Sequence, residues 1–427
     1  MIIHNRWIVG MGVAAVFGWI GTVSDLLADE PIHHLSSETC KTCHKEIYKQ
    51  WKGSMHANST ALSDPIHGTF YQNTVGDPTK EGELHKASQK YPVCLECHAP
   101  NAARDKKTKL DALPVYSEGV NCIACHTLKS YKGIQAPDGK LQLGMKSYEL
   151  TDTLQGPGRY SNRKLASLTA STDIFGGGDS EAKPNPHLGE PVTMDGKEIP
   201  ALPMESNPKQ LKTSDACMGC HDQRNNPHGV PLCQTGNEYS MSNSQVNCLS
   251  CHMPVNDGLV DHSMGGGHDL AILQRSVVFD VTAEKKGDIL ATSVSIRNMQ
   301  PHSLPTGAPF RNIQMLLTAY DSSGNAVWRN AEGHPAQSDP QAYFVYELAD
   351  DEGKPAGPPV ATRLGKDTRL KPHEERKLVY EIPAKDVVLV RGELYYNLLW
   401  AGLVKKFSHL PEDLTASKLI ASSEVSL

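Results

Sequence analysis

The chain has 427 residues and a formal net charge of −6 at neutral pH, with a pI near 6.3. A nucleic-acid partner needs a basic face on the protein, so this acidic balance argues against one. Hydrophobic residues make up 39% of the chain and aromatic residues 6%, which is lean for a length that allows two domains. We therefore expect something other than apolar side chains to fill part of the interior.

The first residues have the pattern of a targeting segment. Arg6 precedes an apolar run from Trp7 to Ile20, and acidic residues follow Ala28. This pattern is typical of a secretory signal peptide, so we expect residues 1–28 to be cleaved after Ala28 and the protein to be exported to the periplasm or the cell surface. An uncleaved membrane anchor, with the apolar run continued to Val23, stays open as the alternative.

Five copies of one pattern, Cys-x-x-Cys-His, follow between residues 40 and 252. The pattern is typical of covalent haem c attachment, in which two thiols form thioethers to one haem and the adjacent imidazole is the proximal iron ligand. Random placement of the 11 cysteines and 19 histidines would give only about 0.01 copies. Disulfides or zinc knuckles would not explain a histidine directly after every pair. We expect five haem c groups, attached to Cys40, Cys43, Cys94, Cys97, Cys122, Cys125, Cys217, Cys220, Cys248 and Cys251 and ligated by His44, His98, His126, His221 and His252.

We expect residues 29–270 to be a pentahaem domain made mainly of short helices and loops wrapped on the haems. Helices are predicted around 45–52 and 215–223. The second and third motifs begin 28 residues apart, and the fourth and fifth 31, so the haems of each pair should be neighbours. The segment from Thr127 to Ser214, rich in Gly, Pro, Ser and Asp, including 176–178 and 184–186, is expected to cover the haems.

Beyond His268 the sequence predicts strands. Turn signals at 285–288 and 321–325 and a Pro/Gly-rich loop at 350–359 separate strand-like runs. Several short strands in such a length favour an all-β, immunoglobulin-like sandwich over residues 271–427, which contains no cysteine and so no covalent haem. The strand-like runs are 276–282, 289–297, 313–320, 326–329, 376–382 and 393–400.

The haem half resembles the cytochrome c-554 family of multihaem electron carriers, whose haem arrangement is related to that of hydroxylamine oxidoreductase. The resemblance begins at Cys40-Lys-Thr-Cys43-His44 and continues through Ile47-Tyr48, Trp51, Ser54 and His56-Ala57, with further stretches to about residue 270. The c-554 type has four haems and no β-sandwich, so the haem order and partners cannot be transferred whole. No motif has Lys in place of His, which counts against nitrite reduction of the pentahaem nitrite reductase kind.

The resemblance also implies distal iron ligands. Its strongest candidates are His56, His187 and His268, followed by His262 and His228, with His85, His67, His33 and His34 in reserve. His302 lies in a loop that resembles one in β-domains appended to such cytochromes, which predicts that it faces a haem across the domain boundary. Cys233, the one cysteine outside the motifs, is expected to be a buried structural residue.

Three functions follow from these features. The main hypothesis is an exported electron carrier that passes electrons between closely spaced haems. The second is an oxidoreductase acting on a small nitrogen or sulfur compound at one five-coordinate haem. The third is a subunit of a haem filament that associates with itself through the β-domain. The expected partners are redox proteins, such as a membrane quinol-oxidising or an outer-surface cytochrome.

Overall fold

The computed structural model describes residues 30–158 and 184–427. The predicted signal peptide and the glycines at 176–178 lie outside these residues. Within the described ranges, no helix is long and apolar enough to cross a membrane. Residues 32–427 form one compact unit, so the domain boundary expected at residue 270 stays a prediction.

The haem half is built from short helices, as its sequence predicts. The helix expected at 45–52 is α2 (Lys45–Lys52), and the one expected at 215–223 is α10 (Asp215–His221), which ends two residues earlier. The other helices of this half are η2 (Ile32–His34), α1 (Ser37–Lys41), α3 (Pro65–Thr74), α4 (Leu95–His98), α5 (Pro100–Arg104), α6 (Pro114–Ser117), α7 (Cys122–His126), η3 (Gly144–Ser147), η4 (Pro186–Leu188), α9 (Pro208–Leu211), α11 (Thr235–Met241), α12 (Cys248–His252) and α13 (Leu270–Arg275).

The strands of this half form five separate pairs and no larger sheet among the residues described. Four pairs are antiparallel, and the pair of β3 and β6 is parallel. The pairs are β1 (Leu128–Tyr131) with β2 (Tyr148–Leu150), β3 (Leu154–Gly156) with β6 (Met204–Ser206), β4 (Val192–Met194) with β5 (Lys197–Ile199), β7 (Arg224–Asn225) with β8 (Pro231–Cys233), and β9 (Val255–Asn256) with β10 (Leu259–Val260).

The apolar interior of the haem half is divided into small clusters. One surrounds Tyr71 and Leu95, a second Ile123 and Leu154, and a third Trp51. A domain that folds on its side chains alone usually has one contiguous core. This division fits the expectation that cofactors contribute much of the interior.

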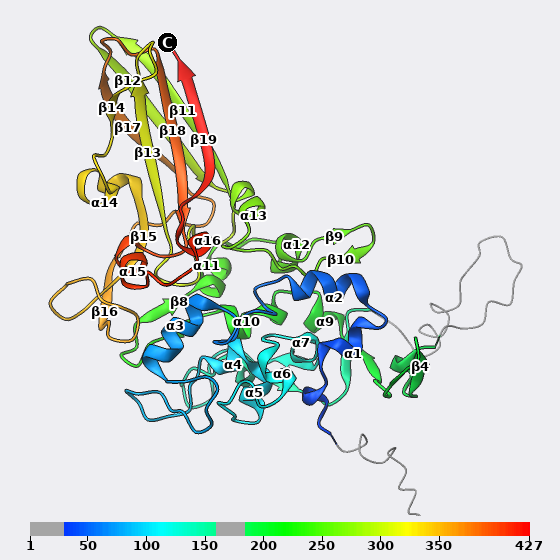
Figure 1. Ribbon diagram of the computed structural model, residues 1–427. Helices are drawn as coiled ribbons and strands as arrows, with labels where there is room; N and C mark the ends of the chain where they lie inside the picture. The colour runs from blue at the N-terminus through cyan, green and yellow to red at the C-terminus, as the bar shows by residue number, and fades with distance from the viewer. Residues whose placement is uncertain (1–29, 159–183) are drawn as a thin grey trace, which may run out of the picture. The chain divides into compact units, whose positions relative to one another are not determined.

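The C-terminal half is a sandwich of two antiparallel sheets, as predicted (Figure 1). The first sheet has the order β11 (Val277–Lys286), β12 (Ile289–Asn298), β17 (Glu375–Pro383). The second has the order β16 (Arg363–Asp367), β15 (Tyr343–Ala349), β13 (Asn312–Tyr320), β18 (Leu389–Asn397), β19 (Lys418–Ser426), with β14 (Ala326–Arg329) also paired to β13. Three short helices accompany the sheets: α14 (Pro335–Ser338), α15 (Ala401–Lys406) and α16 (Glu412–Thr415), together with η5 (Pro340–Ala342).

Alternation along the strands builds the core between the sheets. On β12, Leu290, Val294 and Ile296 are buried and belong to one cluster with Met315 and Leu317 of β13. Side chains at every second position of a strand share a face, so two alternating strands on facing sheets interdigitate their apolar sides.

The haem half contributes to this same core. Ile66 of α3 belongs to the sandwich cluster. The ring of Phe70 stacks on Phe310, with centroids 5.1 Å apart, and meets Phe407 edge-on. Apolar contacts therefore join α3 to the β-domain.

Candidate haem centres

Each of the five motifs lies on a short helix or at its end. Asn121 caps α7 and Asn247 caps α12, each accepting a hydrogen bond from a backbone N–H of the first turn, at 2.9 and 3.0 Å. Residues at i, i+3 and i+4 of a helix share one face. The two thiols and the following imidazole of a motif therefore point to the same side, which is the arrangement that one haem c requires.

Three motif histidines face a second histidine from a distant part of the chain. The pairs, with the distances between ring centroids, are His44 with His187 at 6.1 Å, His221 with His56 at 5.9 Å and His252 with His302 at 6.4 Å. A bond from a metal to an imidazole nitrogen is about 2 Å, and that nitrogen lies about 1.1 Å from the ring centre, so two axial imidazoles on one iron have centroids about 6 Å apart. The three pairs thus have the spacing of two ligands on one iron.

Burial favours the neutral form, the one that ligates iron, in four of these rings: His44, His56, His221 and His302. It lowers the pKa of His56 to about 4 and, helped by the proximity of His56, that of His221 to about 3. Burial likewise lowers the pKa of His302 and of His44.

Backbone carbonyls fix the tautomer of several rings. The Nδ1–H of His252 donates to the carbonyl of Gly265 at 2.7 Å, that of His187 to Leu202 at 2.9 Å, and that of His302 to Ser303 at 3.1 Å. A proton held at Nδ1 leaves the lone pair of Nε2 for a metal. These residues therefore fit the axial positions of c-type haems.

The second motif has a different arrangement. The rings of His98 and His67 have centroids 4.1 Å apart, and both Nδ1 atoms hydrogen-bond the carbonyl of Ser59, at 3.1 and 2.8 Å. The Nε2 atom of His67 is buried without a hydrogen-bond partner. Two imidazoles on opposite sides of one iron cannot share one carbonyl at Nδ1, so His67 does not stand at the axial spacing of the other pairs.

His126, in the third motif, has a looser neighbour. Its Nδ1–H donates to the carbonyl of Gln155 at 2.8 Å. Burial lowers its pKa, and the nearby imidazole of His262 adds to that effect. His262 in turn donates its Nδ1–H to the carbonyl of Val260 at 2.8 Å. Its backbone N–H donates to the side-chain oxygen of Gln50 at 3.0 Å.

The remaining distal candidates lie apart from these pairs. His268 is half-buried near Arg311 and Asp64. His228 is exposed in the turn between β7 and β8. The Nδ1 atom of His85 accepts a hydrogen bond from the backbone N–H of Ser88 at 3.3 Å. Ligation by His268 or His228 stays a prediction.

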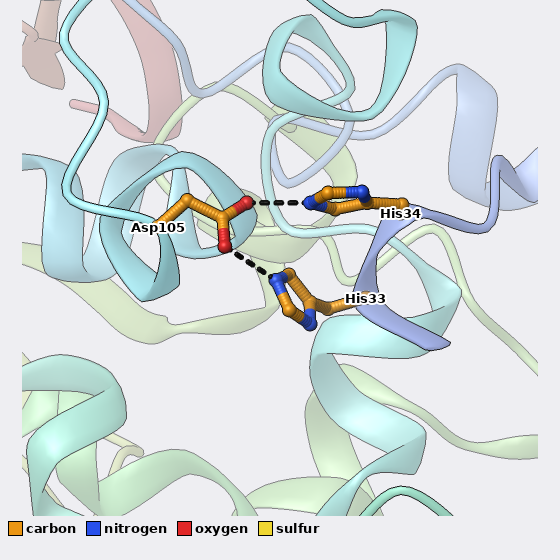
Figure 2. Close-up of side chains that lie close together, drawn as sticks. All are labelled: His33, His34 and Asp105. Atoms are coloured by element: carbon orange, nitrogen blue, oxygen red, sulfur yellow. Dashed lines mark hydrogen bonds and ion pairs between the residues drawn. The ribbon is translucent and has the colours of Figure 1, made fainter. Parts of the chain in front are cut away.

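His33 and His34 both contact one carboxylate (Figure 2). Their Nε2 atoms lie 2.8 and 2.7 Å from the two oxygens of Asp105, and Tyr116 donates its hydroxyl to the same carboxylate at 2.6 Å. Two imidazoles and a carboxylate are a metal-ligand set, and their donor atoms lie within 4.8 Å of one another. Because each Nε2 is already hydrogen-bonded to a separate oxygen, the arrangement as it stands is a hydrogen-bonded anchor for η2.

Thiols of different motifs contact one another. Cys40 lies close enough to Cys122, Cys97 to Cys220 and Cys217 to Cys248 for each to shift the pKa of its neighbour. The fourth and fifth motifs are neighbours, as their short connection predicted. The second and third motifs share no such contact in the described residues; each instead contacts a motif that is distant in sequence.

Arg224 lies deep among these thiols, next to Cys97 and Cys220. Arg224 is half-buried, and within the described ranges the arginines that form ion pairs are others: Arg104, Arg369, Arg376 and Arg391. A guanidinium removed from water is costly unless it is paired. The carboxylates of haem propionates would supply that pairing. Cys233, opposite Arg224 in the β7–β8 pair, is half-buried, with its sulfur 3.7 Å from the hydroxyl oxygen of Thr235.

Comparisons with known proteins show the family of this chain. The family model described as "Cytochrome c554 and c-prime" matches residues 39–127. The crystal structure of a penta-haem cytochrome c552 from Thermochromatium tepidum is 64% identical, with a TM-score of 0.87, over 93% of this chain and 100% of that one. A DUF1425 family member from Shewanella sp. pv-4 matches at 18% identity and a TM-score of 0.16, over 28% of this chain and 74% of that one, which is too weak to compare folds. No curated protein matches the chain.

Proposed function

Because this chain belongs to the multihaem c-type cytochromes, binds five haem c groups covalently and transfers electrons, we propose that its haems form a branched conductor with the fourth haem at the branch point. The thiol contacts between motifs support this order. Each thioether fixes one haem edge beside its sulfur, so motif sulfurs that are near one another bring the edges of two haems near each other.

The branch follows from which motifs meet. The first motif meets the third through Cys40 and Cys122. The fourth meets the second through Cys220 and the fifth through Cys217, and Cys125 of the third motif is also near both of these thiols. Electrons entering at the first haem would pass through the third to the fourth, and from there to the second or the fifth.

We further propose that haems one, four and five each have two histidine ligands, from the three ring pairs, and that His262 is the distal ligand of haem three. Two histidines leave no open coordination site and keep the iron in similar geometry in both oxidation states, which favours electron transfer. The ring spacing near 6 Å is the observation that carries the ligation of haems one, four and five. The proximity of His262 to His126 supports that of haem three.

Electron paramagnetic resonance of the oxidised holoprotein tests the ligation. The imidazole planes of the first and fifth pairs lie 28° and 23° apart, whereas those of the fourth lie 79° apart. Nearly parallel planes split the two iron orbitals that bond with the imidazoles and give a rhombic low-spin signal. Nearly perpendicular planes leave these orbitals close in energy and give a very anisotropic signal with a large maximum g value.

We expect at least two rhombic signals and one large-g signal. His56→Ala should remove the large-g signal, and His187→Ala one rhombic signal, each with the appearance of one high-spin haem. His409→Ala, at an exposed histidine that is not a ligand candidate, is the control and should change neither. Spectra in which His56→Ala and His187→Ala match the unmodified protein would contradict the proposed pairs.

The second candidate function is reduction or oxidation of a small nitrogen or sulfur compound at haem two. The observation that favours it is the 4.1 Å spacing of His67 and His98, which does not suit two axial ligands. Under this hypothesis the oxidised protein has one high-spin haem, and its signal shifts when nitrite, hydroxylamine or sulfite is added. A protein with only low-spin haem would exclude it.

For the surroundings of the protein, we propose export through cleavage after Ala28, a pentahaem domain over residues 29–270 and a β-sandwich domain over residues 271–427. A cytochrome acts with redox partners; a membrane quinol-oxidising or an outer-surface cytochrome would suit an exported one. Mass spectrometry of the mature protein checks the cleavage site. Sedimentation at several concentrations checks self-association through the β-domain, which the filament hypothesis requires.

A further inference from the structure

A buried carboxylate joins the haem half to the loop that carries His302. Glu238 lies on α11, in the segment between the fourth and fifth haem motifs, and is 3% exposed. Its Oε2 atom accepts hydrogen bonds from the backbone N–H of Ser303 at 3.1 Å and from the hydroxyl of Thr306 at 2.6 Å. Glu238 thus contacts the residue directly after His302.

The other oxygen of Glu238 is fixed by an arginine. Arg369 donates from Nη1 to Oε1 of Glu238 at 2.6 Å. The Nε and Nη2 atoms of Arg369 donate to the carboxylate of Asp367, both at 2.8 Å. The Cζ atom of Arg369 lies over the ring of Tyr346, 4.5 Å from the ring centroid. Hydrogen bonds between charged groups in a buried site are strong and directional, so the orientation of Glu238 is set by Arg369.

Thr235 of α11 is a second link from the haem half, with its hydroxyl oxygen 2.9 Å from that of Thr306. Other anchors of the loop come from the β-domain. The side-chain amide of Asn298, at the end of β12, donates to the carbonyl of His302 at 2.8 Å. Leu304 and Leu370 exchange two backbone hydrogen bonds, at 2.8 and 3.0 Å. These bonds fix the loop to the sandwich, whereas Glu238 fixes it to the chain segment that carries the haem motifs.

We propose that Glu238 is the positioning residue that holds His302 in the axial position of the fifth haem. The proposal rests on the ligation of that haem by His302, whose ring lies 6.4 Å from that of His252. A metal ligand must be held to within about 0.5 Å of its productive position, and residues behind the ligand provide that precision. With Glu238 in place, the fifth haem keeps its second ligand only while the β-domain stays docked on α11.

Glu238→Gln in the full-length holoprotein tests the role. Glutamine has the same size as glutamate but only one oxygen that accepts hydrogen bonds, since its other terminal atom is an NH2 donor. It therefore cannot accept hydrogen bonds from Ser303 and Thr306 on one side and from Arg369 on the other. We expect the ratio of dissociated to bound His302 to rise roughly tenfold or more on loss of a charge-assisted hydrogen bond. The rate at which cyanide binds to this one haem should rise by the same factor, because cyanide enters when His302 leaves.

Two further variants complete the experiment. Glu238→Asp keeps the charge but shortens the side chain, so its cyanide rate should lie between those of the unmodified protein and Glu238→Gln. Glu347→Gln is the control, since Glu347 also lies in an ion pair, with Lys366 at 3.6 Å, but forms no ion pair with Arg369 among the described residues. Its cyanide rate should not change.

His302→Ala tests the ligation of the fifth haem separately from the positioning role of Glu238. If it produces one high-spin haem per chain, the ligation holds. If Glu238→Gln and Glu238→Asp then bind cyanide no faster than Glu347→Gln, the positioning role is wrong. If His302→Ala produces no high-spin haem, the ligation itself is wrong. Should Glu238→Gln fail to mature with haem, Thr306→Val, which removes one of the same hydrogen bonds, gives the same comparison.

Discussion

At the scale of single residues, Asp105 shows how one carboxylate can hold a segment of chain. Burial alone raises its pKa, but hydrogen bonds from Tyr116, His33 and His34 more than offset this and lower it from 3.8 to about 2. A carboxylate with a lowered pKa in the folded protein stabilises the fold above its unfolded pKa and loses that effect as the pH falls through its folded pKa. The stabilisation is therefore complete above about pH 4 and is lost towards pH 2.

Asp105→Asn should lower the free energy of unfolding of the holoprotein by at most about 2 kcal/mol near neutral pH, from the size of the pKa shift. The difference between the variant and the unmodified protein should shrink as the pH is lowered from 4 to 2. Thermal unfolding at a series of pH values measures it. Asp351→Asn, at an exposed residue, is the control. A stability difference that does not depend on pH in this range would contradict the assignment.

Residue types and local spacing predict the covalent haem sites but not which histidines meet. His302 ranks low from sequence because it lies in a β-domain loop, yet its ring stacks with that of His252. His268 ranks high by the resemblance; it is half-buried near Arg311, and its ligation stays a prediction. The pairing depends on contacts between residues far apart in the chain, and no periodicity within the sequence encodes those.

At the scale of elements, α10 is closely fitted to its surroundings at Gly219, the residue before Cys220. The Gly219 N–H donates to the hydroxyl oxygen of Tyr148 at 2.8 Å, and that hydroxyl donates to the carbonyl of Ala216 at 3.0 Å. A Cβ atom at Gly219 would collide with the ring of Tyr148 and with Ser147. Both of these residues are buried, so neither can move aside easily.

Gly219→Ala should therefore destabilise the holoprotein by about 1–3 kcal/mol, the usual cost of overpacking. Because α10 carries His221, the large-g signal assigned to haem four should also shift or broaden. Chemical denaturation and paramagnetic resonance measure the two effects. Ser250→Ala changes the equivalent position of the fifth motif, where the side chain is exposed, and should leave both unaltered. Equal stability of the two variants would show that the close fit at Gly219 has no energetic consequence.

The strands that the sequence predicts are those with alternating burial. β12, β13 and β17 appear within a few residues of their expected limits. β15 was missed because almost all of its residues are buried, so it has no alternation, and β16 because all of its residues are exposed. β19, the last strand, was missed as well: its half-exposed residues include serines and a glutamate, which are poor strand formers by type.

At the scale of the whole molecule, the two halves differ in what stabilises them. The sandwich has one large apolar cluster between its sheets. The haem half has several small clusters, and its histidines and thiols are arranged to contact cofactors. Hydrophobic burial alone would offset the chain entropy of folding in the sandwich, whereas the haem half needs the burial and iron ligation that haem contributes.

Full-length chain made without haem attachment should therefore have an unfolded haem half and a folded sandwich. Hydrogen exchange followed by mass spectrometry would show fast exchange over residues 30–158 and 184–270, with protection kept in β12, β13 and β18. The holoprotein, measured in parallel, should be protected in both halves. Slow exchange of α3 and α10 in the haem-free chain would mean that the small apolar clusters suffice to fold the haem half. Loss of protection in β13 would mean that the sandwich depends on the haem half, through contacts such as those of Ile66 and Phe70.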